Sequence, residues 1–306
     1  MSFFSSNNSN KWKDVPVRLG TIVIGIPLLW MLWLDDSLRW IFWESVHLLV
    51  LYEYTYMANC NAVGMGLSSL ILTHSPSTET QLCLLVFFTA IATLSARNSN
   101  NNRTITETTY LQGWMMISVP FSIWLRLSSS STYGFVRTVS LLLTVWNCDT
   151  GALVAGRLVG GKLFGKKNLT LLRHELNTIS PKKSVEGLIG GLILGTLTYA
   201  SLPHLYTFLN SLQFVPLSNV TTVSRFRRTS SQVFYDLTFG LVLSIAAILG
   251  DLWESKLKRQ YNVKDTSKAL PGHGGILDRF DSSLLSVLVY HFILNSRYYD
   301  SHDRGY

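Results

Sequence analysis

The chain has 306 residues, of which 47% are hydrophobic and only 14% are charged, and its net charge is +8. Soluble domains carry about 25% charged residues, so this composition argues against a soluble protein and indicates a membrane protein. The basic residues lie in connectors between apolar runs, where positive charge orients a membrane protein, so the net charge does not indicate nucleic-acid binding.

The polar N-terminus, residues 1–18, is rich in Ser and Asn, and we predict that it is disordered. The apolar run after it continues through Trp30 and Trp33 without a small-residue cleavage site. This pattern favours an uncleaved first helix over a signal peptide.

Apolar segments then recur along the whole chain. With its flanks, each approaches the length of about 20 residues that crosses a bilayer as a helix. We predict helices at Leu19–Leu34, Leu38–Ala58, Ala62–Thr73, Leu82–Ala96, Tyr110–Leu127, Phe135–Asn147, Val185–Leu202, Val233–Gly250 and Ser282–Asn295, and a weaker pattern marks Pro203–Leu217. The predicted fold class is therefore all-α, a polytopic integral membrane protein with about 8–10 transmembrane helices.

The distribution of polar residues divides this single domain into parts. Residues 19–145 are predicted to form a hydrophobic transmembrane scaffold, and residues 298–306 a polar tail. Residues 146–297 are predicted to form the transmembrane catalytic part of the same domain, because most of the chain's clustered charge lies there.

Polar residues of this second part concentrate in three blocks, at 147–167, 180–187 and 250–281. The third block is densely charged although apolar runs precede and follow it. Charge at a membrane boundary is expensive and is kept mostly for function, so we expect the active site there. In the first block, Asp149 stands at the predicted end of a helix, where it either begins a basic loop or serves the site. The glycines after it, Gly156 among them, suit phosphate contact and helix packing equally well.

Carboxylates stand at both ends of the third block. Asp251, Glu254 and Lys258 share one face of a predicted helix, and Asp278 and Asp281 share another if that segment is helical. Mg²⁺ usually takes one or two carboxylates and completes its shell with phosphate oxygens and water. The alternative is that these groups are solvated ion pairs, which contribute little. Several acids compressed between two apolar runs favour the metal site.

A glycine-rich turn lies between the two acidic ends. Its residues run Pro271-Gly272-His273-Gly274-Gly275, and the backbone amides of such a turn can approach an anion closely. His273 is flanked by glycines and has no apolar face to bury, which favours a functional role. Together with the neighbouring cations, the block predicts a site for a metal-bound nucleoside triphosphate.

The third block resembles the signature of the phosphatidate cytidylyltransferase family, also called CDP-diacylglycerol synthases. The matching residues are Ser255, Lys258-Arg259, Lys264-Asp265, Ser267, Leu270-Pro271, His273-Gly274-Gly275, Asp278-Arg279 and Asp281. Two upstream motifs of the family are similar to Asp149-Thr150-Gly151-Ala152 with Gly156-Arg157, and to Ser180-Pro181-Lys182-Lys183-Ser184 with Glu186-Gly187. The resemblance covers the C-terminal half, whereas the first 145 residues are similar only in being hydrophobic helices.

The resemblance implies that phosphatidate attacks the α-phosphorus of CTP, which releases pyrophosphate and forms CDP-diacylglycerol for phospholipid biosynthesis. It implies Mg²⁺ held by Asp251, Asp278 and Asp281, and leaves open a second, monovalent cation such as K⁺. It makes these three residues and His273 catalytic. It assigns substrate binding to Asp149, Lys182, Lys183, Ser255, Lys258, Arg259, Lys264, Gly274, Gly275 and Arg279.

The expected partners are CTP, phosphatidate and membrane lipids, with no nucleic acid. A homodimer, and the identity of the membrane, are left open. Two other functions stay as alternatives: a CTP-dependent lipid or polyprenol kinase, and a non-enzymatic membrane transporter. A transporter would commonly show repeated halves, but the chain has no internal repeat and its charges cluster toward one end.

Overall fold

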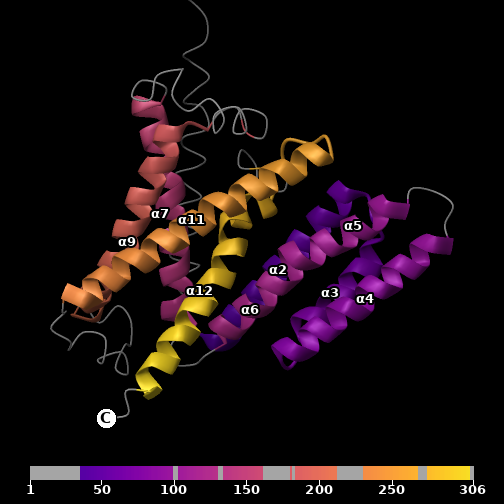
Figure 1. Cartoon of the computed structure of the whole chain (residues 1–306), viewed down its shortest axis with the longest axis horizontal. Coiled ribbons are helices and arrows are strands. Elements are labelled where there is room, and N and C mark those ends of the chain that lie inside the picture. The colour runs from indigo at the N-terminus through magenta and orange to yellow at the C-terminus, as the bar shows by residue number, and fades with distance from the viewer. Residues whose placement is uncertain are drawn as a thin grey trace, which may run out of the picture.

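A computed structural model describes residues 35–98, 103–129, 134–160, 180, 183–211, 230–267 and 274–303 (Figure 1). Every regular element within these ranges is a helix, so the predicted all-α fold is confirmed. The predicted polar N-terminus and the predicted helix Leu19–Leu34 lie outside the described residues.

The helices fall into two groups with α12 between them (Figure 1). The first group is α2 (Asp36–Ala58), α3 (Ala62–Thr73), α4 (Thr78–Asn98), α5 (Arg103–Gly113), the π-helix η1 (Trp114–Ser118) and α6 (Val119–Ser128). The second group is α7 (Gly134–Val159), α9 (Val185–Ser211) and α11 (Ser230–Gln260). The last helix, α12 (Leu277–Asp303), contacts α11 and α7 on one side and α6 and α2 on the other.

Local sequence sets the ends of the first helices. Asp35 caps α2 because its carboxylate accepts the Leu38 N–H at 2.9 Å. The helix ends at Ala58, and the next residue, Asn59, has a φ of 49°, a left-handed conformation that Asn tolerates. Asn61 then caps α3 by accepting the N–H groups of Val63 and Gly64. The reversal between α2 and α3 therefore needs only three residues.

An aromatic cluster joins α12 to the first group. The ring centroids of Trp43 on α2 and Trp124 on α6 lie 4.5 Å apart, and Phe280 on α12 lies 5.6 Å from Trp43. Such ring pairs add about 0.5–1.5 kcal/mol beyond the area that they bury. Because Phe280 immediately precedes Asp281, this packing fixes the rotation of α12 and turns Asp281 toward the second group.

The protein is a multi-pass integral membrane protein. In the described residues, α7, α9 and α11 are long and apolar enough to cross a membrane, and α3 and part of α4 are shorter apolar helices. Small residues let α7 and α9 pack closely: a Cβ atom added to Gly190 would lie 2.2 Å from the Cβ of Ala155 and 2.9 Å from the carbonyl oxygen of Gly151.

This contact predicts that Gly190→Ala separates α7 from α9. Overpacking a tight interface costs about 1–3 kcal/mol, so the thermal midpoint of the protein in detergent should fall by several degrees. Gly66→Ala is the matched control, since nothing lies within 4 Å of the added methyl group on α3. Equal midpoints for the two variants would contradict the close packing.

Two sequence expectations are corrected. First, α7 does not end at Asn147 but continues to Val159, so Asp149 lies within a helix and does not begin a loop. Polar side chains are accommodated there by partners within α7 and on α12: the Thr150 hydroxyl donates to the Trp146 carbonyl at 2.8 Å, and Asp149 accepts from the Ser282 hydroxyl at 3.3 Å. Second, no new helix begins at Pro203, the start of the weakly patterned segment Pro203–Leu217, because Pro203 lies inside α9.

Candidate functional site

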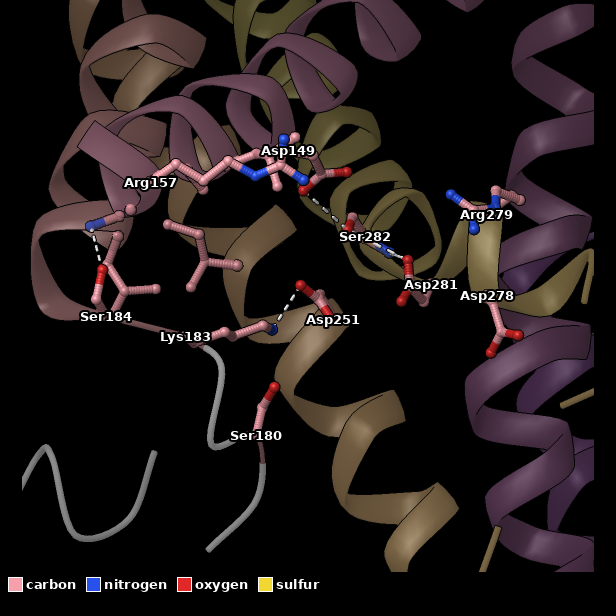
Figure 2. Close-up of a pocket in the computed structure, with 16 residues that line it drawn as sticks. Asp149, Arg157, Ser180, Lys183, Ser184, Asp251, Asp278, Arg279, Asp281 and Ser282 are labelled. Carbon is pink, nitrogen blue, oxygen red and sulfur yellow. Dashed lines mark hydrogen bonds and ion pairs between the residues drawn. The ribbon is translucent and has the colours of Figure 1, made fainter. Parts of the chain in front are cut away.

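A cavity of about 530 Å³ opens among α7, α9, α11 and the start of α12 (Figure 2). Its volume falls in the range of small-molecule sites, roughly 300–1,000 Å³. The lining residues are Asp149, Ala152, Leu153, Gly156, Arg157, Ser180, Lys183, Ser184, Gly187, Leu188, Ile248, Asp251, Asp278, Arg279, Asp281 and Ser282. The cavity thus brings together all three polar blocks of the sequence.

Carboxylates from three helices line this cavity (Figure 2). Asp149 comes from α7, Asp251 from α11, and Asp281 together with Asp278 from α12. The Ser282 hydroxyl lies 3.3 Å from Oδ1 of Asp149 and 3.3 Å from Oδ1 of Asp281, so it can donate to either carboxylate. Asp281 also experiences the charges of both Asp251 and Asp149. A set of neighbouring like charges favours a cation between them.

Gly250 permits this convergence. A Cβ atom at Gly250 would lie 2.7 Å from the backbone oxygen of Asp281, so only glycine lets α11 and α12 approach so closely here. Asp251 is the next residue of α11 and is therefore held opposite Asp281. The Ser255 hydroxyl, one turn further along α11, donates to Asp251 Oδ1 at 3.4 Å.

Lys183 forms an ion pair with Asp251. Its ammonium group lies 2.5 Å from Asp251 Oδ2. Figure 2 marks this ion pair with a dashed line. The lysine is held there by the start of α9, where the Ser184 hydroxyl accepts the Gly187 N–H at 3.1 Å and so caps the helix. Gly156 of α7 both lines the cavity and packs near Gly187, so both interpretations of this glycine fit its position.

Asp278 lies to one side of the three carboxylates (Figure 2) and has partners of its own. Its carboxylate accepts hydrogen bonds from Lys258 Nζ at 2.8 Å, the Gly275 N–H at 2.8 Å and the Thr266 N–H at 3.1 Å. Burial by itself would raise the pKa of Asp278, but the Lys258 ammonium and the Gly275 amide outweigh it and lower that pKa. Asp278 is therefore an ionised anchor for the chain around it.

Glu254 is a buried carboxylate that the predicted site set omits. It lies on α11 and is paired at 2.5 Å with Lys258, which therefore bridges Glu254 and Asp278. The signal was present in the sequence, because Glu254 shares a helical face with Asp251 and Lys258. Arg157 and Ser282 also line the cavity without belonging to that set.

The remaining predicted site residues differ in whether they line the cavity. Arg279 lines the cavity, whereas Arg259 and Lys264 are exposed and are not among its lining residues. Gly274 has a φ of 81°, which favours glycine. His273 and Lys182 lie outside the described residues. The roles predicted for these residues stay predictions.

The predicted carboxylates can be compared with the ligands that Mg²⁺ requires. Within the described ranges, no three His, Cys, Asp or Glu side chains are arranged to hold one ion, so the predicted trio does not form a ready three-carboxylate cage. Mg²⁺ needs only one or two protein carboxylates. Asp251 and Asp281 fit this need, since both are hard oxygen donors on facing helices of one cavity. Asp278 fits it less well, because three donors already occupy its carboxylate.

Comparison with known proteins gives a consistent picture. A family model described as the cytidylyltransferase family matches residues 17–297. The chain is 33% identical over 178 residues to a phosphatidate cytidylyltransferase of Bacillus subtilis, covering 58% of this chain and 54% of that protein. It is 35% identical over 162 residues to one of Helicobacter pylori, with coverages of 53% and 48%. It is 31% identical over 183 residues to one of Rickettsia bellii, with coverages of 60% and 68%. The chain thus spans about half the length of the first two relatives and about two thirds of the third.

Proposed function

The chain belongs to the cytidylyltransferase family, as its motifs predict, and on this basis we propose that it is a phosphatidate cytidylyltransferase. In this reaction an oxygen of the phosphatidate phosphate attacks the α-phosphorus of CTP. The new phosphorus–oxygen bond forms as the bond to the bridging oxygen breaks, and pyrophosphate leaves with that electron pair. CDP-diacylglycerol is the other product.

One observation carries the proposal: a cavity lined by acids and cations lies among helices that can cross a membrane. Both substrates bring phosphates, and one also brings acyl chains that stay in the lipid. A cavity at such a position can receive CTP from water and phosphatidate from the lipid.

The cations of the cavity suit the phosphates. Arg157, Lys183 and Arg279 line the same cavity as the carboxylates, and an arginine can bind a phosphate through two parallel hydrogen bonds. Phosphoryl transfer depends mainly on in-line positioning and on neutralising charge, and it needs little covalent chemistry from the protein. The side chains of the cavity supply these two functions.

Asp251 and Asp281 are the residues that we propose to hold Mg²⁺, with Asp149 beside them. A bound Mg²⁺ neutralises charge on the reacting and leaving phosphate oxygens. Ser255 orients Asp251, and Ser282 lies between Asp281 and Asp149, so hydroxyl groups hold the proposed ligands in place. Lys183 adds positive charge beside Asp251.

The position of the label in product lipid tests the proposal. Membranes containing the protein are given phosphatidate and CTP labelled either at the α-phosphorus or at the γ-phosphorus. We expect the α-label alone to enter the lipid, which is cytidylyl transfer. Transfer of the γ-label would identify a lipid kinase, and transfer of neither label would favour a transporter. Membranes that lack the protein are the control.

A further inference from the structure

Glu53 is a buried carboxylate in the group of helices that the sequence predicts to be only scaffold. It lies on α2 and is 3% exposed. Its two oxygens accept four hydrogen bonds. The donors are the Thr266 hydroxyl at 3.1 Å, the Ser267 hydroxyl at 2.5 Å, the Ile276 N–H at 2.9 Å and the Leu277 N–H at 2.8 Å. A carboxylate so well satisfied fixes the groups that bond to it.

These donors come from two separate stretches of the third polar block. Thr266 and Ser267 follow α11, whereas Ile276 directly precedes α12 and Leu277 begins it. Glu53 therefore holds the two stretches together from a third helix. It also places negative charge at the N-terminus of α12, where free N–H groups attract anions. Because Glu53 occupies these amides, they are not free to bind a substrate phosphate.

The same stretches hold Asp278 of the cavity. The Thr266 hydroxyl donates to Glu53 while the Thr266 N–H donates to Asp278. The Gly275 N–H also donates to Asp278, and Asp278 in turn pairs with Lys258. Displacement of Glu53 would therefore move the donors that orient the Asp278 carboxylate.

The lack of a side chain at Gly275 lets Glu53 approach the turn closely. A Cβ atom there would lie 2.7 Å from Glu53 Oε2 and 2.0 Å from the Thr266 hydroxyl oxygen. Any larger residue would push the carboxylate away from the turn. The second glycine of the signature therefore serves the approach of Glu53 from α2.

We propose that Glu53 is a positioning residue for the transfer reaction, which acts by holding residues 266–267 and 275–277 so that Asp278 and Arg279 face the cavity. The inference rests on the proposed function for its kinetic consequences, but its contacts can be tested without substrate. The competing role is a purely structural one, in which Glu53 only stabilises the N-terminus of α12.

The test uses Glu53→Gln in the purified full chain, with Glu44→Gln as the matched control. Glu44 is on the same helix, but its carboxylate contacts His47 and His74 instead of the turn. For Glu53→Gln we expect faster amide hydrogen exchange in the peptide 274–281. We also expect kcat per folded protein to fall about 10–100-fold, with KM for CTP changed less than about threefold, because a displaced reacting geometry lowers the rate. Glu44→Gln should behave as wild type in both measurements.

Thr266→Val provides a milder variant in case Glu53→Gln folds poorly. It removes one donor to Glu53 and retains the N–H that bonds Asp278, so we expect a smaller loss of kcat. Added to Glu53→Gln, it should cause less than an additive loss, because both changes act on the hydrogen bond between Thr266 and residue 53. Additive losses would overturn the proposal.

Wild-type kcat per folded protein in Glu53→Gln would refute the positioning role, even if the protein were less stable. Wild-type exchange in the peptide 274–281 would refute the contact itself. If wild-type protein makes no CDP-diacylglycerol, the proposed function fails, and the exchange measurement still decides whether Glu53 holds the turn.

Discussion

Asp281→Asn is expected to lower formation of CDP-diacylglycerol at least about 100-fold while the protein remains folded in membranes. Asp281 is buried at the meeting point of α11 and α12, beside Asp251 and Asp149. The substitution removes one of the two charges that we propose to hold Mg²⁺, and it keeps the size and the hydrogen-bonding oxygen of the side chain. Any residual activity should require more Mg²⁺ than the wild type does.

Activity measured against Mg²⁺ concentration checks this expectation. Asp236→Asn is the control, because it makes the same chemical change on α11 at a residue that does not line the cavity. Wild-type turnover and an unchanged Mg²⁺ dependence in Asp281→Asn would remove Asp281 from the proposed metal site.

Asp278→Asn is expected to lower both activity and stability. The Asp278 carboxylate accepts from Lys258 and from the Thr266 and Gly275 amides, and a neutral side chain with one carbonyl oxygen cannot satisfy all three donors. Hydrogen bonds to charged groups contribute about 1.5–3 kcal/mol each, so the thermal midpoint should fall by several degrees. Activity should fall at least about tenfold, because the turn that carries Arg279 loses its anchor.

The two aspartates are therefore distinguished by stability. Asp281→Asn should leave the midpoint in detergent close to that of the wild type, or raise it by relieving repulsion, whereas Asp278→Asn should lower it. The measurement is thermal unfolding without substrate or metal. Equal midpoints for wild type and Asp278→Asn would show that its contacts do not anchor the turn.

Helices were the most predictable part of the fold. The apolar runs at Ala62–Thr73 and Val233–Gly250 lie within or coincide with helices, because a membrane segment must satisfy its own backbone hydrogen bonds. The run Tyr110–Leu127 is helical throughout, but a π-helix interrupts it at Trp114–Ser118. Helix ends were predicted less well, because polar residues such as Asp149 look like the end of a helix when their partners on other helices are unknown.

Much of the site was also visible in the sequence. Charge inside an apolar chain marks positions that are expensive to keep, and this led to Asp149, Lys183, Asp251, Asp278 and Asp281, which all line one cavity. Helical spacing placed Asp251, Glu254 and Lys258 on one face, and the signature motif predicted the family. Local patterns carry this information, because spacing along a helix fixes which neighbours meet.

Local patterns could not reveal which groups each carboxylate contacts. Asp278 and Asp281 lie on one turn of α12, yet Asp278 bonds the chain around it while Asp281 joins carboxylates from α7 and α11. Glu53 meets Leu277 across 224 positions of sequence. No periodicity encodes such a contact, because it depends on how α2 packs against α12. The sequence alone thus determined which residues are charged and that Asp251, Glu254 and Lys258 share a helical face, and tertiary packing decided which of those charges share a cavity.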